Sequence, residues 1–253
     1  MKMRRFSSGA RRVFAGAAAM AIAVVLAAVP PLAAGSYAGE SAGADVIAAA
    51  AAEPTAGDIV YFGTYPQTLI GHSEDVGVPD VPYRSVTYTD KYYEEQNGTY
   101  YYAAEPVAWR VLAKDGGRLF LLSEKQLIGG IAYNDVIGPP AAIQWSGSTM
   151  RGYLNGTMIG DLFTAEEQTA VAAARLVNDT DFDFRNGEDG AVTDDKLFLL
   201  SLRELLAYLP EMASREAPIT DFADDRGQYA QPRSETPNHG AVSTAWWLRE
   251  GGP

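Results

Sequence analysis

The stretch Val107-Ala-Trp-Arg-Val-Leu-Ala-Lys-Asp-Gly-Gly-Arg-Leu-Phe-Leu-Leu122 contains the clearest strand signal in the chain. In its first part Val107, Trp109 and Val111 alternate with three other residues, the period of two that is typical of a strand with two distinct faces. Asp115-Gly-Gly117 is typical of a turn, and an apolar run returns directly after it. The stretch therefore predicts an antiparallel hairpin.

A ten-residue pattern occurs twice, at residues 118–127 and 196–205, with six of the ten positions identical. Each copy is an apolar run that ends in a serine, Ser123 or Ser201. Gln126 and Glu204 follow three residues later, which is the spacing of a capping box at a helix N-terminus. We therefore expect each copy to turn from a strand into a helix.

Other local signals predict short elements separated by long connections. They are an opening strand at residues 57–63, a helix at 148–154 ended by Asn155-Gly156, a helix at 165–172 that begins with a capping box of Thr164 and Glu167, and a strand at 244–249. The long segments near residues 64–105 and 210–243 are expected to be irregular, and such segments are where binding function usually lies. The predicted fold class is a single mixed α+β domain over residues 57–253.

The N-terminus has the composition of an export signal. Five basic residues lie among the first twelve, no acidic residue precedes Glu40, and residues 13–29 carry no charge. Small residues at Ser36 and Ala38 suit cleavage there, so residues 1–38 are predicted to be a signal peptide. An uncleaved membrane anchor is the alternative, and Arg11-Arg12 leaves a twin-arginine route open beside the general secretory route. Residues 39–56 are rich in Ala and Gly and are predicted to be a linker.

Composition and charge exclude several classes of protein. The chain has no cysteine, which excludes disulfides, a thiol nucleophile and cysteine-based metal sites. The net charge is −12, and loss of residues 1–38 would leave 15 basic against 32 acidic residues, or −17. Such a surface disfavours nucleic acid and anionic membranes as partners of the mature form.

Five sequence blocks occur in an order that resembles a known family. They are Trp109-Arg-Val-Leu112, Leu121-Leu-Ser123, Trp145 with Ser148-Thr-Met-Arg-Gly-Tyr-Leu-Asn155, Asp195-Lys-Leu-Phe-Leu-Leu-Ser201, and Trp246-Trp-Leu-Arg249. This series is similar to a bacterial family of exported and cell-surface proteins that is known only as a domain of unknown function. The family is distantly similar to the C-type-lectin-like fold that formylglycine-generating enzymes share. The resemblance thus implies a C-type-lectin-like variant of the α+β class.

The resemblance also implies structural roles for the residues of these blocks. They are Trp109, Trp145, Arg151, Asn155, Asp195, Ser201, Trp246, Trp247 and Arg249. In such a scaffold tryptophans occupy the core, while arginine and asparagine tie loops by hydrogen bonds. Relatives continue past the double tryptophan with further closing strands, whereas this sequence ends at Pro253. We therefore expect a domain that is incomplete at its C-terminus, either truncated or completed by a partner.

Signals for chemistry are sparse. The chain has no nucleophile elbow, phosphate-binding loop or dinucleotide fingerprint, and its two histidines, His72 and His239, supply at most half a transition-metal site. Asp179, Asp181 and Asp183 alternate in an acidic segment and offer the oxygen ligands that Ca²⁺ prefers. The segment lacks the glycine and glutamate of an EF-hand, so a solvated acidic loop is the alternative. No other cofactor is predicted.

Tyrosines supply the strongest binding signal. Seven of the 14 tyrosines lie within residues 83–102. A structural interpretation is a tyrosine-rich β-hairpin around the turn dipeptide Asn97-Gly98, and it is compatible with a binding role. We expect ligand contacts from Tyr92, Tyr93, Tyr100, Tyr101 and Tyr102, because tyrosine rings suit saccharide stacking and protein interfaces. The predicted function is a secreted or cell-surface, non-catalytic module that binds a glycan or a protein. The alternatives are an extracellular glycoside hydrolase that acts through carboxylates, or a truncated product without function.

Overall fold

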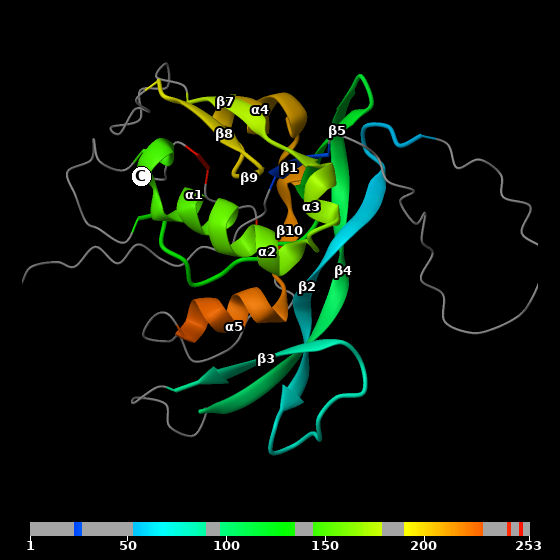
Figure 1. Cartoon of the computed structure of the whole chain (residues 1–253), viewed down its shortest axis with the longest axis vertical. Helices are drawn as coiled ribbons and strands as arrows, with labels where there is room; N and C mark the ends of the chain where they lie inside the picture. The colour runs from blue at the N-terminus through cyan, green and yellow to red at the C-terminus, as the bar shows by residue number, and fades with distance from the viewer. Residues whose placement is uncertain are drawn as a thin grey trace, which may run out of the picture.

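The computed structural model describes residues 23–26, 53–89, 97–134, 144–178, 190–229, 242–243 and 248–249. Its strands are β1 (Ala23–Leu26), β2 (Ile59–His72), β3 (Tyr83–Tyr88), β4 (Gly98–Asp115), β5 (Arg118–Ser123), β6 (Val171–Ala172), β7 (Ala174–Val177), β8 (Val192–Asp195), β9 (Leu197–Phe198), β10 (Ala217–Pro218) and β11 (Val242–Ser243). Its helices are η3 (Trp145–Gly147), α1 (Thr149–Tyr153), the π-helical η4 (Leu154–Met158), α2 (Ile159–Leu162), α3 (Glu167–Ala170), α4 (Leu202–Tyr208), η5 (Met212–Arg215) and α5 (Asp221–Tyr229). The fold is α+β (Figure 1).

The main sheet has seven strands, in the order β2-β4-β5-β1-β6, with β3 also paired to β4 and β9 to β1. The hairpin predicted at residues 107–122 is confirmed, because β4 and β5 pair antiparallel from Trp109–Ser123 to Asp115–Arg118. The turn residues Gly116 and Gly117 have φ angles of 52° and 87°. Two consecutive positive φ angles are what a tight hairpin turn requires.

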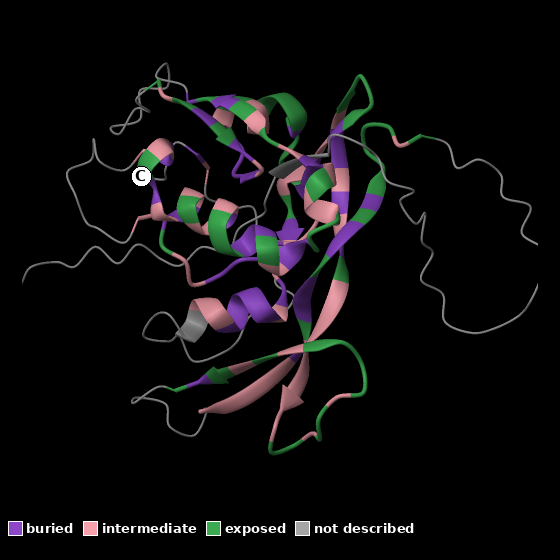
Figure 2. Cartoon of the chain, in the orientation of Figure 1, coloured by how far each residue is buried: buried purple, intermediate pink, exposed green. Residues whose placement is uncertain are grey.

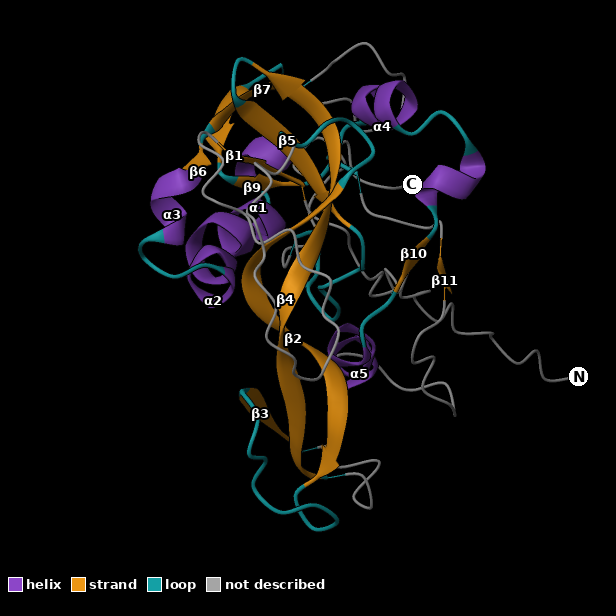
Figure 3. Ribbon diagram, turned by 90° about the vertical axis from the view of Figure 1, so that its right-hand side faces the viewer, coloured by secondary structure: helices purple, strands orange, loops and turns teal. Residues whose placement is uncertain are grey.

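The prediction that residues 64–105 are irregular is wrong over most of their length. β2 continues to His72, and β4 begins at Gly98, so the two strands form a long twisted ribbon to which β3 adds a third strand (Figure 3). Register shifts along the β2–β4 pair interrupt the alternation of apolar and polar residues. Such bulges hide a strand from a search for a period of two.

The tyrosine-rich hairpin is confirmed, because β3 and β4 pair antiparallel, but Asn97-Gly98 does not lie at the centre of its turn. Gly98 already pairs with Tyr88 across β3 and β4. Its φ angle is 150°, and a Cβ atom at this position would lie 1.8 Å from Nε2 of His72. Glycine is therefore required here by the close approach of the His72 ring.

The helix expected to end at Asn155-Gly156 continues for two more turns. α1 passes directly into the π-helical η4 and then into α2, which ends at Leu162. Met150, Leu154 and Met158 on one side of this continuous helix are fully buried, and η4 and α2 contact β9 and β2 of the main sheet. Burial of that side stabilises the helix across a dipeptide that would end it in isolation.

The three predicted capping boxes have different outcomes. The box of Ser201 and Glu204 is confirmed at the start of α4. Thr164 and Glu167 also exchange the two expected hydrogen bonds, but α3 ends at Ala170 and the chain continues as β6. The helix predicted after Ser123 is wrong, because Gln126 bridges to Ile219 and its side-chain amide donates to the carbonyl of Ala217.

The segment 210–243 also differs from the irregular prediction, because it contains η5, β10, α5 and β11. α5 packs against the β2–β4 ribbon, between the helical layer and β3 (Figure 1). The core lies between the sheet and the helices, where residues are buried, whereas the end of the ribbon at β3 is largely intermediate or exposed (Figure 2). The end of the ribbon at β3 therefore leaves many of its side chains accessible to solvent.

Candidate functional site

The end of the ribbon carries a cluster of tyrosines on two opposite faces. On one face Tyr88 and Tyr100 pack edge to face with ring centroids 5.7 Å apart, and His72 packs on Tyr100 at 4.8 Å. On the other face Tyr83 and Tyr101 form an edge-to-face pair at 5.1 Å. The faces separate because adjacent residues of a strand point to opposite sides of the sheet.

The face with Tyr83 and Tyr101 is hereafter the tyrosine face. By strand alternation and register it comprises Tyr83, Ser85 and Thr87 from β3 together with Thr99, Tyr101 and Ala103 from β4. The three β3 residues are exposed, and the hydroxyls of Thr87 and Thr99 lie 2.8 Å apart. The face is uncharged and combines two rings with several hydroxyls, a mixture that suits a neutral polar ligand.

The structure removes Tyr102 from the expected ligand contacts, because its side chain is fully buried. Its hydroxyl donates to Oδ2 of Asp225 at 2.8 Å, and its ring packs edge to face on Phe222. Tyr102 thus attaches α5 to the ribbon. Of the other expected contacts, Tyr101 lies on the tyrosine face and Tyr100 lies on the opposite face, toward α5. Tyr92 and Tyr93 lie outside the described residues.

Sequence reasoning missed α5 and its link to the ribbon. Thr220 accepts a hydrogen bond from the backbone N–H of Ala223, and acidic residues occupy the first turn. A threonine followed by acidic residues is a recognised helix start, so this signal was present in the sequence. The buried carboxylate of Asp225 was not recognisable, because nothing local distinguishes it from the other acidic residues.

Burial and the negative charge of Asp225 raise the pKa of Tyr102 above that of a free tyrosine. Burial also raises the pKa of Tyr88 from 10.0 to about 12, although the hydrogen bond with Tyr102 acts in the opposite direction. Both hydroxyls therefore stay protonated in the folded protein at pH values where the unfolded chain releases its protons.

This difference predicts a loss of stability at alkaline pH. The contribution of Tyr88 is fully present below pH 10 and is lost as the pH rises from the unfolded value of 10.0 toward the folded value of about 12. The expected loss is roughly 1–3 kcal/mol in the free energy of unfolding. Urea unfolding between pH 8 and pH 11.5 measures it, and Tyr88→Phe should make the curve shallower. The prediction fails if Tyr88→Phe alters the alkaline curve no more than Tyr61→Phe, a change at an exposed ring.

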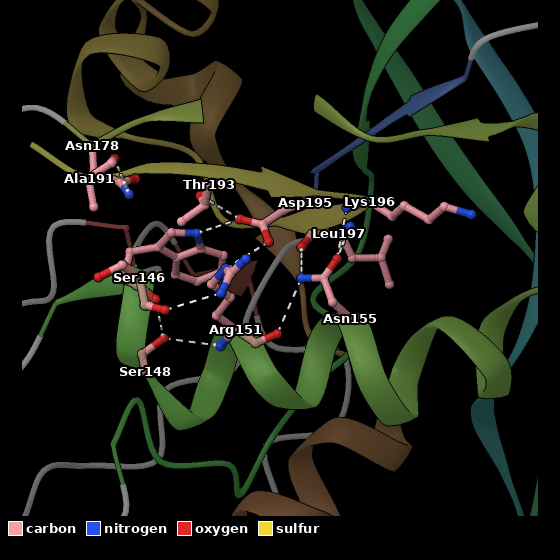
Figure 4. Close-up of polar contacts among 11 residues, drawn as sticks. Ser146, Ser148, Arg151, Asn155, Asn178, Ala191, Thr193, Asp195, Lys196 and Leu197 are labelled. Atoms are coloured by element: carbon pink, nitrogen blue, oxygen red, sulfur yellow. Dashed lines mark hydrogen bonds and ion pairs between the residues drawn. The ribbon is translucent and has the colours of Figure 1, made fainter. Parts of the chain in front are cut away.

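A second polar group surrounds the fully buried carboxylate of Asp195 (Figure 4). Oδ2 accepts hydrogen bonds from Nε1 of Trp145 at 2.9 Å and from the hydroxyl of Thr193 at 2.8 Å. Oδ1 accepts from Nε of Arg151 at 2.7 Å, which completes an ion pair. Three donors from η3, α1 and β8 thus meet on one carboxylate, as a buried charge requires.

The helix that carries Arg151 is held in place by two further side chains (Figure 4). Ser148 caps α1 by accepting from the backbone N–H of Arg151. The amide of Asn155 donates to the carbonyl of Leu197 at 2.9 Å and accepts from the backbone N–H of Lys196 at 2.8 Å. Asn155 therefore binds the β8–β9 backbone as a neighbouring strand would.

Arg249 occupies a third buried polar position and is only 3% exposed. Its guanidinium donates to both carboxylate oxygens of Glu204, the residue that caps α4 together with Ser201. Its backbone N–H donates to the carbonyl of Leu200. The residue thus attaches the end of the chain to α4. Trp246 and Trp247 lie outside the described residues.

These polar groups are arranged to join elements. Trp109 and Trp145 are fully buried, and the Nε1 of Trp109 donates to the carbonyl of Phe62 at 2.7 Å.

Among the described residues no group of three or more histidine, aspartate or glutamate side chains is placed to hold a metal ion. The expected calcium ligands Asp179, Asp181 and Asp183 lie outside the described ranges. No helix in the described part of the chain is long and apolar enough to cross a membrane.

The fold is a mixed α+β domain in which buried polar side chains link helices to neighbouring strands, with an aromatic ribbon at one end. Residues 116–251, more than half of the chain, match the family model described as Domain of unknown function (DUF6273), and the chain belongs to this family. No curated protein and no solved structure matches the chain. The matched residues include the Asp195 group, whereas the tyrosine face precedes them.

Proposed function

We propose that this protein is an exported, non-catalytic binding module that contacts a glycan or a protein at the cell surface through its tyrosine face. The single observation that carries the proposal is the edge-to-face pair of Tyr83 and Tyr101, on a face whose β3 residues are exposed and whose six positions carry no charge. Tyr83 is 38% exposed, so its ring is accessible for stacking. Export is supported by the basic and then uncharged sequence of residues 1–38.

A glycan is the ligand class that this surface fits best. Pyranose rings present apolar C–H faces that stack on aromatic rings, and their hydroxyls exchange hydrogen bonds with serine and threonine. Ser85, Thr87 and Thr99 lie beside the two rings on the same face. The absence of charged side chains from these six positions favours a neutral saccharide over an acidic one.

The proposed fold is C-type-lectin-like, on the strength of the five ordered sequence blocks. Two of them converge in the Asp195 group, where Trp145, Arg151 and Asp195 meet. The arginine of a further block, Arg249, binds the α4 cap. In this proposal the blocks hold the scaffold rigid while the ribbon makes contact, which is the division of labour expected of a binding domain.

The test is a glycan array and a panel of extracellular proteins, probed with the purified full-length chain. We expect Tyr83→Ala and Tyr101→Ala each to weaken binding by roughly tenfold or more, as aromatic contacts at the centre of an interface do. Tyr61→Ala is the matched control, because Tyr61 is 41% exposed on the same sheet but pairs with Ala108, far from β3. Each variant should keep the melting temperature of the wild type to within a few degrees.

Two outcomes would contradict the proposal. Equal loss of binding in Tyr61→Ala would show that the tyrosine face is not the contact surface. Hydrolysis of a polysaccharide that is abolished by changing one aspartate or glutamate would instead establish the carboxylate-dependent glycoside hydrolase.

A further inference from the structure

The hydroxyl of Tyr65 is buried among apolar and cationic neighbours. Tyr65 lies in β2, is only 1% exposed, and packs its ring edge to face on Phe222 of α5 with centroids 5.6 Å apart. Among the residues that the structure describes, none exchanges a hydrogen bond with this hydroxyl. A buried polar atom without a partner costs free energy, so the hydroxyl marks a place where the chain itself does not supply the partner.

A guanidinium with few contacts lies beside this hydroxyl. Arg226 follows Phe222 by one turn of α5, and its guanidinium carbon is 5.5 Å from the centroid of that ring. Within the described part of the chain it donates one hydrogen bond, to the hydroxyl of Tyr153 in α1 at 3.4 Å, and forms no ion pair. A guanidinium has five N–H donors, so most of those of Arg226 have no acceptor in the protein.

Tyr65, Tyr153 and Arg226 are hereafter the donor group, and they come from β2, α1 and α5. Burial raises the pKa of Tyr65, and the neighbouring phenol of Tyr153 raises it further, so the Tyr65 hydroxyl is protonated at neutral pH. The hydroxyl of Tyr153 accepts from Arg226, which leaves its own proton for donation. The donor group therefore combines two hydroxyl donors with a cation and needs an acceptor.

Two carboxylates on the surrounding elements already have partners. Asp161 of α2 forms an ion pair with Arg84 of β3 at 3.0 Å, and Asp225 of α5 accepts a hydrogen bond from Tyr102 at 2.8 Å. Their negative charges disfavour a ligand that carries two or more charges of the same sign. The donor group thus fits a singly charged oxyanion. A planar carboxylate also matches the fork of a guanidinium.

We propose that the donor group is a binding site for the carboxylate of a small molecule or an acidic sugar. Arg226 holds the carboxylate, the hydroxyls of Tyr65 and Tyr153 donate to its remaining lone pairs, and the ring of Phe222 contacts the rest of the ligand. Tyr153 and Arg226 are only partly buried, so a ligand reaches the site from their side. The site lies between the ribbon and the helices (Figure 1) and shares no residue with the tyrosine face.

The experiment measures the melting temperature of the full-length chain in sodium acetate, sodium glucuronate and sodium phosphate, each compared with sodium chloride at equal ionic strength. We expect a carboxylate to raise it by about 3 °C or more at about ten times its dissociation constant, because a ligand that binds only the folded chain stabilises it. Isothermal titration should give a dissociation constant of about 1 mM or below. A response to acetate and glucuronate identifies the carboxylate alone as the recognised group, whereas a response to glucuronate alone identifies an acidic sugar.

Two variants separate ligand binding from a structural role. Tyr65→Phe removes only the hydroxyl, so it should keep or raise the melting temperature without ligand and weaken carboxylate binding by about tenfold or more. Arg226→Gln removes the charge and should weaken binding by at least as much. The matched controls Arg175→Gln, at an exposed arginine of β7, and Tyr61→Phe, at an exposed tyrosine, should bind as the wild type does. If Arg226→Gln does not fold, Tyr65→Phe alone is the test.

Four results would overturn the site. The first is a melting temperature that neither carboxylate raises above its value in chloride, which would mean that water satisfies the donor group. The second is carboxylate binding that survives Tyr65→Phe, and the third is an equal loss of binding in Arg175→Gln. The fourth is a larger effect of phosphate than of either carboxylate. The readouts do not depend on the tyrosine face, so the failure of one proposal leaves the other standing.

Discussion

Trp109→Ala is expected to lower the free energy of unfolding by about 3–5 kcal/mol, the usual cost of removing a large aromatic side chain from a core. Trp109 is fully buried in β4, where it lies between β2 and β5. Its ring stacks on Phe163 with centroids 6.2 Å apart, which joins the sheet to the end of α2. The cavity left by the indole therefore affects both layers of the domain.

Urea unfolding of the full-length chain, followed by circular dichroism, measures this loss. Trp109→Phe should fall between the wild type and the alanine variant, because it retains a ring but loses the hydrogen bond to the carbonyl of Phe62. Tyr61→Ala, on the exposed face of the neighbouring strand, should change stability by no more than about 0.5 kcal/mol. A loss below about 1 kcal/mol in Trp109→Ala would contradict the position of this residue. A wild type without a cooperative transition would favour the alternative that the chain has no function of its own.

Asp195→Ala should cost a similar amount, about 3–5 kcal/mol, for an electrostatic reason. The substitution removes the only carboxylate in the group and leaves Nε1 of Trp145, the hydroxyl of Thr193 and Nε of Arg151 without their acceptor. Removing one partner of a buried ion pair is costly because the other charge loses its compensation. Arg151 is 31% exposed at its side chain, so water reduces this cost in part.

The matched control is the neighbouring residue in the same strand. Asp194 alternates with Asp195 in β8 and is exposed, so Asp194→Ala should leave stability within about 0.5 kcal/mol of the wild type. A double-mutant cycle of Arg151→Ala and Asp195→Ala should give a coupling energy of about 1–3 kcal/mol. Equal effects of the two aspartate substitutions, or a cycle without coupling, would refute the arrangement of the Asp195 group.

Both substitutions act on the scaffold, whereas Tyr83→Ala and Tyr101→Ala act on the proposed contact surface. The distinction follows from burial: Trp109 and Asp195 are inaccessible to a ligand, and Tyr83 is not. A stability defect with loss of binding is therefore expected from the first pair. Loss of binding with normal stability is expected from the second pair.

Local signals in the sequence predicted the elements whose partners are close along the chain. The β4–β5 hairpin has its alternation and its glycine turn within 16 residues, and Ser201 and Glu204 cap α4 from three residues apart. The same Ser-x-x-Gln spacing at Ser123 predicted a helix that does not form. There the tertiary contacts of Gln126 with Ala217 and Ile219 prevail over the local preference.

The candidate site was predicted in its composition but not in its geometry. The density of tyrosines indicated this ribbon as the candidate, and alternation alone puts Tyr101 and Tyr102 on opposite faces. Which face is buried depends on α5, whose Asp225 comes from 123 residues further along the chain. The sequence therefore could not separate Tyr102 in the core from Tyr101 on the tyrosine face.

The amino-acid sequence by itself determined the α+β class, the central hairpin and the α4 cap, because each depends on contacts between residues that are near neighbours in the chain. Only the tertiary structure decided that Asp195, among 32 acidic residues, is the buried acceptor for Trp145 and Arg151. It also decided that Asn155 continues a helix and binds β9. Burial and long-range pairing are properties of the folded chain, and no short window of sequence contains the residues that produce them.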